Sequence, residues 1–319
     1  MFLKFLKSAI AAATLLLVPG VASAQDFPTK DVTIVVGWPP GGSTDVLARL
    51  VADELTKKWG KTVIVENRPG GEGAISASHV SAQPADGHTL LWSSGTLTIA
   101  PNMLDVGYDP RTDFKPISLL AGVPRIVVVN PKLLPVTTLQ EFIDKAKAEP
   151  GSIRMSTGGL ASIQSLMLQH FSNLVGIKLN LVPYQGGQAT LTAVLSGEVH
   201  GSIVAPVDAL EYLKSGQFTA LAISSAAGLS SLPDVPSIAT AAGIDYDETS
   251  WIGVLAPAGT PDEIVNKLYT DINAVMALPE MQDRLELAGW QPIASTPEEF
   301  TAFIAAEMDK WAGVMADSK

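Results

Sequence analysis

Residues 32–45 read VTIVVGWPPGGSTD, a β-branched run followed by a loop rich in proline and glycine. The run at 32–36 is typical of a buried strand, and the apolar residues that recur from Val46 to Leu55 have the spacing of a helix. A strand, a glycine-rich turn and a helix in this order form the first half of a βαβ unit. The stretch therefore predicts an α/β fold, and it leaves open what the loop binds.

The segments that follow repeat this pattern. Strands are predicted at 62–66 and 88–94, with a helix at 74–83 between them. The order β-α-β-α-β implies a parallel sheet with helices on both faces. Further strands are predicted at 125–130, 153–157, 178–184, 201–206 and 218–225, and helices at 139–149, 161–175, 187–197 and 207–215. This second set is long enough, at about 100 residues, for a second α/β domain.

The last third of the chain carries an apolar strand at 251–257 and three predicted helices. Two of these helices begin with the same helix-start motif, at Thr260-Pro261-Asp262-Glu263 and at Thr296-Pro297-Glu298-Glu299. Each places a threonine at the N-cap, a proline at the first helical position and a glutamate at the third. The shorter helix between them spans 278–288.

The first 24 residues have the features of a secretory signal peptide. Lys4 and Lys7 precede an apolar run at 9–18, and Ala22-Ser23-Ala24 is a small-residue cleavage site. The apolar run is shorter than the roughly 20 residues that a membrane-spanning helix needs. We therefore expect a signal peptide at 1–24, cleavage after Ala24, and export of a soluble mature chain to the periplasm.

Charge and cysteine content restrict the function further. Loss of Lys4 and Lys7 with the signal peptide takes the formal net charge from −11 to −13, which argues against nucleic acid as a partner. A local group of backbone N–H donors can still bind a small anion against this overall charge. The chain has no cysteine, so it carries no lipid-anchoring cysteine and no disulfide, as suits a periplasmic protein with a large core.

The loop at 37–45 lies where open α/β sheets bind ligands, between the carboxyl end of a strand and the N-terminus of a helix. Unpaired N–H groups and the helix dipole suit an anion there, Gly41 and Gly42 allow close approach, and Ser43 and Thr44 add hydroxyl donors. Asp45 is better suited to capping the helix or bracing the loop. The loop lacks the Gly-Lys-Ser/Thr of a phosphate loop, so nucleotides are disfavoured. A turn followed by an ordinary helix cap remains an alternative.

The sequence gives little support to catalysis or to a metal site. It lacks a cysteine nucleophile and a G-x-S-x-G motif. The four histidines, His79, His88, His170 and His200, do not have the spacing of a zinc site. We therefore expect no enzyme, no catalytic residue, no metal and no cofactor. A secreted serine hydrolase stays open as an alternative, because a Ser-His-Asp set assembled across two domains leaves no local motif.

Other short polar loops also follow predicted strands, and together they suggest a cleft lined by backbone donors from two domains. Arg125 is a cation beside an apolar run that could pair with a carboxylate. A surface arginine at the domain boundary is the alternative. The candidate residues in the other strand-end loops are Ser94, Thr96, Ser156, Gly158, Gly159 and Asp208.

The mature chain resembles the Bug family, the periplasmic solute-binding receptors of tripartite tricarboxylate transporters. The resemblance runs over essentially the whole mature chain, and VENRPGG, VPYQGG and APAGTP are its most distinctive blocks. The longer matching segments are FPTKDVTIVVGWPPGGSTDVLARLVADEL, VIVENRPGGEGAISASHV, ADGHTLLW, VPYQGGQATLTAVLSGEV, LPDVPSIATAAG and WIGVLAPAGTPDEIVNKL.

This resemblance implies a type II periplasmic-binding-protein fold, in which two α/β domains close on a ligand between them. It implies a first domain built from 25–123 plus 228–319 and a second domain at 124–227. It also implies a carboxylate grip by Gly41, Gly42, Ser43, Thr44 and Asp45, and more loosely by Ser94, Thr96, Ser156, Gly158, Gly159 and Asp208. Two residues depart from the family pattern that the resemblance implies: Trp38 stands where phenylalanine or another residue is usual, and Arg125 where an apolar residue is commoner.

The expected function is therefore capture of a small carboxylate for a tripartite tricarboxylate transporter. A dicarboxylate or an aromatic carboxylate is favoured, because Trp38 offers a flat apolar surface and Arg125 could meet a second carboxylate. Citrate-like and amino-acid ligands are the nearest rivals. The expected partners are the membrane permease subunits, with no nucleic acid and no second copy of the chain. A sensor receptor for the same ligand class is the alternative.

Overall fold

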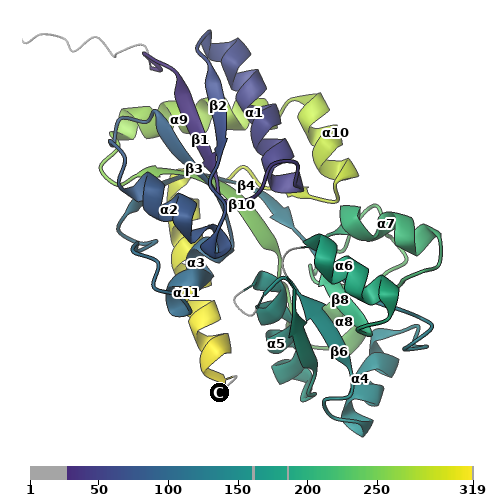
Figure 1. Cartoon of the computed structure of the whole chain (residues 1–319). Coiled ribbons are helices and arrows are strands. Elements are labelled where there is room, and N and C mark those ends of the chain that lie inside the picture. Colours follow the sequence, from purple (N-terminus) through teal and green to yellow (C-terminus); the bar gives the residue numbers. More distant parts are fainter. Residues whose placement is uncertain (1–26, 160–161, 185–186, 318–319) are drawn as a thin grey trace, which may run out of the picture.

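The computed structural model describes residues 27–159, 162–184 and 187–317. The chain forms two sheets, each covered by helices, which occupy the upper and the lower part of Figure 1. The predicted signal peptide at 1–24 and its cleavage after Ala24 lie outside the described residues. Within the described part, no helix is both long and apolar enough to cross a membrane.

The first sheet has six strands in the order β11-β4-β10-β3-β1-β2. Strand β1 pairs in parallel with β2 and β3, which confirms the predicted parallel β-α-β-α-β unit. Strand β10 runs antiparallel between β3 and β4, so the complete sheet is mixed. The strands are β1 Val32–Val36, β2 Val63–Asn67, β3 Thr89–Ser94, β4 Phe114–Val123, β10 Ser250–Pro257 and β11 Gln291–Pro292.

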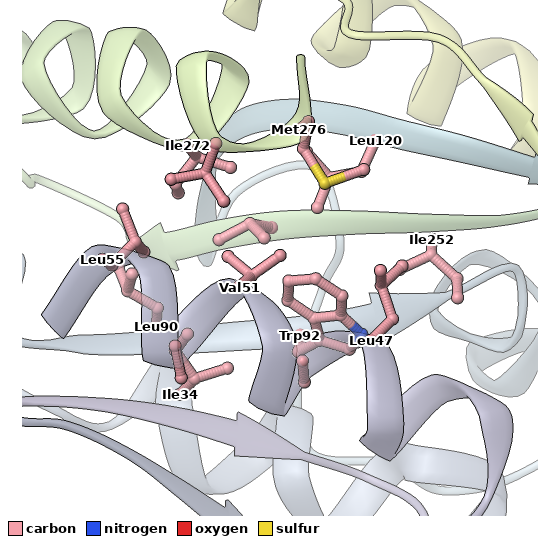
Figure 2. Packing of buried hydrophobic residues seen from close by; sticks show 14 of the residues in the cluster. Ile34, Leu47, Val51, Leu55, Leu90, Trp92, Leu120, Ile252, Ile272 and Met276 are labelled. Atoms are coloured by element: carbon pink, nitrogen blue, oxygen red, sulfur yellow. The ribbon is translucent and has the colours of Figure 1, made fainter. Parts of the chain in front are cut away.

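Helices cover both faces of this sheet. Helices α1, α9 and α10 pack on one face, and Figure 2 shows side chains of α1 and α9, among them Val51 and Ile272, meeting Trp92 and Ile252 of the sheet. Helices α2, α3 and α11 pack on the other face. The elements are α1 Ser43–Trp59, η1 Gly71–Gly73, α2 Ala74–Ser81, α3 Thr96–Ile99, η2 Ala100–Asn102, α9 Asp262–Met276, α10 Pro279–Leu287 and α11 Pro297–Asp317.

The second sheet has five strands in the order β7-β6-β8-β5-β9. Strand β6 is parallel to β7 and β8, whereas β5 is antiparallel to β8 and β9. The strands are β5 Ile126–Val129, β6 Arg154–Thr157, β7 Asn180–Pro183, β8 Gly201–Val204 and β9 Thr219–Ile223. The helices are α4 Leu139–Ala148, α5 Ile163–Val175, α6 Gly187–Ser196, α7 Pro206–Lys214 and α8 Ile238–Ala242.

The chain passes between the two sheets along β4 and β10. Strand β4 leads through Pro124 and Arg125 into β5, and β10 carries the chain back into the first sheet. Ile238 and Tyr246 belong to the core of the second sheet, and so does Trp311 near the end of α11, which runs from the first domain alongside α5 (Figure 1). The division of the chain near residues 123 and 227 stays a prediction.

The two predicted N-caps have different outcomes. The second is confirmed, because Glu299 N–H donates to Thr296 Oγ1 at 3.2 Å and Thr296 N–H donates to the Glu299 carboxylate at 2.8 Å. The first is wrong, because the N-cap of α9 is Pro261. The buried Thr260 hydroxyl turns back toward the end of β10 and donates to Pro257 O at 2.8 Å.

Gly253 of β10 sets how closely α11 approaches the sheet. A Cβ on Gly253 would lie 2.7 Å from Cε1 of Phe300, which is fully buried. We expect Gly253→Ala to lower the free energy of unfolding by about 1–3 kcal/mol, because α11 must move away from the sheet. Urea denaturation at pH 7 measures this change.

The matched control is Gly313→Ala, in the same helix α11, where a Cβ would meet open space. We expect this variant to gain up to about 1 kcal/mol from helix propensity. Equal effects of the two substitutions would contradict the role of Gly253.

Candidate ligand-binding site

The strand ends of the first sheet meet at one edge. Val123, the last residue of β4, pairs with Ser250, the first residue of β10. Ser94, the last residue of β3, pairs with Ile252 of β10, and β1 runs parallel to β3. The loops that follow β1, β2 and β3 therefore lie at the edge where the chain crosses to the second sheet.

The second sheet presents its strand ends in the same way. Ile126, the first residue of β5, pairs with Val204 and Ile223, the last residues of β8 and β9. Strand β6 is parallel to β8, so the loop after Thr157 lies at this edge too. The carboxyl ends of both sheets thus lie on either side of the crossing segments, which is where α/β folds bind ligands.

Contacts across this boundary show that the two edges face each other. A Cβ on Gly289 would lie 2.7 Å from Cβ of Pro206 at the start of α7. A Cβ on Gly95 would lie 4.0 Å from Ile163 at the start of α5. Both contacts join a loop of the first domain to a helix N-terminus of the second.

The loop after β1 ends at Gly42, the N-cap of α1, and Gly41 adopts φ 86°, which favours glycine. The first intrahelical bond of α1 runs from Val46 N–H to Gly42 O at 2.9 Å. The N–H groups of Ser43 and Thr44 precede this bond and have no acceptor within the helix. Gly41 and Gly42 are exposed and Thr44 is half-buried, so the helix N-terminus is open to an anion. The Ser43 side chain lies outside what the structure describes.

Asp45 holds this loop in place. Its buried carboxylate accepts from Gly41 N–H at 2.9 Å, from the Arg49 guanidinium at 3.0 Å on each oxygen, and from Asn67 Nδ2 at 2.7 Å. Burial raises its pKa, but the hydrogen bonds from these three groups outweigh burial and hold the pKa below its ordinary value. With both oxygens engaged, Asp45 is suited to bracing the loop, as its sequence position indicates.

Trp38 is half-buried and packs against the core beneath α1. Its carbonyl accepts from Asn67 Nδ2 at 3.0 Å, so the same side chain ties both Trp38 and Asp45 to the end of β2. Part of the indole is therefore committed to the core, and part of Trp38 stays exposed in the loop after β1.

Ser94 and Thr96 lie together after β3. Their hydroxyl oxygens are 3.3 Å apart, and Thr96 is buried at the start of α3. A Cβ on Gly73 would lie 3.6 Å from Thr96 Oγ1, so the loop after β2 adjoins them. The structure therefore brings the predicted residues of the first domain to one edge.

The loop after β6 uses most of its polar groups internally. The fully buried Ser156 hydroxyl donates to Thr190 O at 3.1 Å, so it faces α6. Gly158 N–H donates to Gln164 Oε1 at 2.7 Å, and Gly159 O accepts from Ser162 Oγ at 2.7 Å. In the described part of the loop, these bonds fix its shape and engage the Gly158 N–H and the Ser162 hydroxyl.

Arg125 and Asp208 face each other without forming an ion pair. Among the described residues, no side-chain partner lies within hydrogen-bonding distance of the buried Arg125 Nε. Burial lowers the pKa of the Arg125 guanidinium to about 10, an effect that Asp208 partly offsets. Burial raises the pKa of the Asp208 carboxyl, and Arg125 opposes that rise. Arg125 is thus a cation at neutral pH with an unsatisfied donor, which suits an anionic ligand group.

Sequence reasoning missed Glu72 as a site residue. Its carboxylate Oε1 lies 3.0 Å from the position that a Cβ on Gly159 would occupy, so it reaches from the first domain to the second. An acidic residue inside a glycine-rich loop after a strand was the available signal.

Two further features of the described structure concern a metal site and a cavity elsewhere. In the described residues, no group of three or more histidine or acidic side chains could hold a metal. A cavity of about 270 Å³ beside the crossing segments contains none of the predicted site residues. It is lined by Ser225, Ala227, Asp247, Thr249, Gln291, Phe303, Glu307 and Lys310.

Comparison with known proteins places this geometry in a family. Residues 47–318 match the model of the tripartite tricarboxylate transporter family receptor. The chain is 33% identical over 299 residues to protein BugT of Bordetella pertussis, an alignment that covers 93% of this chain and 91% of BugT.

Solved structures give the same result. That of R. palustris Rpa4515 with adipate has a TM-score of 0.82 at 33% identity, covering 92% of this chain and 98% of that one. The periplasmic binding protein BugD has a TM-score of 0.79 at 27% identity, covering 92% and 98%. MatC of Rhodopseudomonas palustris with bound malate has a TM-score of 0.78 at 27% identity, covering 90% and 99%. The predicted periplasmic-binding-protein fold is thereby confirmed.

The brace at Asp45 predicts a pH-dependent stability. Its folded pKa lies below the ordinary value of 3.8, so its contribution is present above that value and is lost as the pH falls through the folded pKa. We expect Asp45→Asn to lower the free energy of unfolding by about 1–3 kcal/mol at pH 7. The deficit should shrink toward pH 3, and denaturation across this range measures it.

The control is Asp53→Asn, on the exposed side of the same helix. We expect this variant to match the parent protein at every pH. A deficit in Asp45→Asn that does not change with pH would contradict the assignment.

Proposed function

Because the chain belongs to the tripartite tricarboxylate transporter receptor family, a family of solute-binding receptors and not of enzymes, we propose that it captures a small carboxylate in the periplasm for uptake. The ligand would be held between the two domains and delivered by the closed form to the membrane permease subunits. The signal-peptide features at 1–24 support this location.

The open N-terminus of α1 is the observation that carries this proposal. Gly41 and Gly42 leave its backbone exposed, and Asp45 fixes the loop without occupying the N–H groups of the first helical turn. The N–H groups and the helix dipole would receive one ligand carboxylate there. Trp38 would contact the ligand body through the exposed part of its ring.

The second domain would complete the site through Arg125. Its guanidinium, whose buried Nε has no partner among the described residues, would meet a second carboxylate, and the negative charge of Asp208 would favour its charged form. Rpa4515 with adipate and MatC with malate are relatives whose ligands carry two carboxylates. The proposed ligand is accordingly a dicarboxylate. Ser94, Thr96, Gly158 and Gly159 would line the remaining boundary, and Ser156 would support it from within the sheet.

A sensor receptor remains the second candidate, because the same closed form could dock on a membrane signalling protein. The acidic chain is expected to act as a monomer in either role. Family membership sets the serine hydrolase alternative aside.

The proposal predicts a carboxylate-dependent rise in melting temperature. A ligand that binds only the folded state stabilises it in proportion to the logarithm of its excess over Kd. Thermal shift against carboxylates, sugars and metal ions should give a rise only with carboxylates. A chromogenic ester should be bound without turnover. A shift with sugars or cations alone would contradict the proposal.

Arg125→Met should separate dicarboxylates from monocarboxylates. Loss of a hydrogen-bonded charge pair should weaken dicarboxylate binding by roughly 10- to 100-fold and leave monocarboxylates of equal length unchanged. Calorimetric titration of both ligand types measures the difference. Arg154→Met is the control, because Arg154 is exposed at the start of β6, whereas the end of β6 at Thr157 lies at the proposed site. Equal weakening of both ligand types would rule out the proposed role of Arg125.

A further inference from the structure

Glu72 occupies a backbone position that ordinarily suits glycine. Four consecutive residues have positive φ: Gly70 at 130°, Gly71 at 57°, Glu72 at 55° and Gly73 at 89°. A side chain in the left-handed region costs energy, and such positions persist where the surrounding structure enforces them, often at functional sites. The turn itself needs only glycine here, so the Glu72 side chain calls for a separate explanation.

The backbone next to Glu72 packs against the residues that follow two neighbouring strands of the first sheet, β1 and β3. A Cβ on Gly37 would lie 2.9 Å from Gly73 Cα, and a Cβ on Gly73 would lie 3.6 Å from Thr96 Oγ1. The loop after β2 therefore packs against the residues that follow β1 and β3. Glu72 comes one position before Gly73, and its side chain extends from this loop toward the second domain.

The Glu72 carboxylate lies against the loop after β6 in the second domain, at Gly159. Oε1 is 3.0 Å from the position of a Cβ on Gly159, so it contacts bare backbone. The nearby Gly158 N–H already donates to Gln164 Oε1. Ser162 Oγ already donates to Gly159 O. Among the described residues of this loop, these two donors are therefore not left to pair with the Glu72 carboxylate.

Within the described residues, Glu72 has no hydrogen bond and no ion pair, although it is half-buried. Burial raises its pKa, and no nearby charge opposes that rise. By contrast Glu66, in strand β2 just before this loop, forms an ion pair with Arg68, whose Nε lies 2.6 Å from Glu66 Oε1. Among the described residues, the loop after β2 thus carries an unpartnered acceptor where it adjoins the residues that follow β1 and β3.

We propose that Glu72 is a specificity-determining residue that accepts a hydrogen bond from a hydroxyl or ammonium group of the ligand. This inference rests on the proposed function and narrows it to carboxylates that also carry a hydrogen-bond donor. An unsubstituted acid would place its own charge near Glu72 without a donor to compensate. A hydroxy or amino acid would satisfy the carboxylate and gain a charge-assisted hydrogen bond. The two solved relatives with adipate and malate include one ligand without a hydroxyl and one with it, so the family leaves the choice open.

Matched ligand triads test this inference by calorimetric titration at pH 7. Each triad keeps one skeleton and changes only the substituent beside the carboxylate: succinate, malate and aspartate; glutarate, 2-hydroxyglutarate and glutamate; adipate, 2-hydroxyadipate and 2-aminoadipate; phenylacetate, mandelate and phenylglycine. In the parent protein we expect the hydroxy or the amino member of at least one triad to bind about 10- to 100-fold more tightly than the unsubstituted acid. The better of the two identifies the donor.

Glu72→Gly removes the carboxylate and places glycine at a positive φ, so this variant should fold at least as well as the parent protein. We expect its preference within the triad to fall to about threefold or less. Glu66→Gln is the control, because that carboxylate already has a partner, and its preference should match the parent's.

The results separate the inference from the proposed function. An unsubstituted acid that binds as tightly as its hydroxy and amino analogues would overturn the role of Glu72 while leaving carboxylate capture intact. A donor preference that persists in Glu72→Gly would overturn it as well. Absence of binding by every carboxylate, in these triads and in the wider panel, would instead reject the proposed function.

Discussion

The antiparallel pairing of β10 with both β3 and β4 is the constraint on which the site depends. It places β10 inside the first sheet, with its first residue, Ser250, beside Val123 at the end of β4. The two segments that cross to the second sheet therefore lie side by side. Because β1 and β3 are parallel, their carboxyl ends must open toward the same crossing, where those of β6 and β8 also end. The close approach of Phe300 to Gly253 packs α11 against this central strand.

Around that crossing, the polar groups divide into those that build the loops and those that remain unpaired. Asp45, Gln164 and Ser162 satisfy backbone groups and give the loops a fixed shape. Arg125 Nε and the Glu72 carboxylate have no partner among the described residues. Leaving the buried Arg125 Nε without a partner is costly, so this donor is better explained by a ligand than by the fold. Arg125 of the second domain and Glu72 of the first lie on edges that face each other, and together they favour a ligand that carries both acceptors and a donor.

Local sequence patterns predicted most of the longer elements of the fold, but they missed the short elements α3, α8 and β11 and the long strand β4. The strand at 32–36 and the helix caps at Thr296 depend on neighbouring residues only, and both are confirmed. Strand β4 was missed because Lys115, Pro116 and Gly122 interrupt the strand pattern. Pro116 is accommodated because it pairs with Leu255 at a register shift, where a backbone donor is dispensable. That shift depends on β10, which is more than 100 residues away along the chain.

The sequence alone determined the strand, turn and helix around GWPPGGSTD, because the periodicity and the N-terminal turn of a helix are set within a few residues. It also determined the family, through blocks spread along the chain. Only the tertiary structure decided which side chains are already paired. Ser156 donates to Thr190 and lies inside the second domain, whereas Arg125 and Glu72 remain unpaired at the boundary. Their partners, or the lack of them, come from residues distant in sequence, and no local pattern records which distant groups the fold brings together.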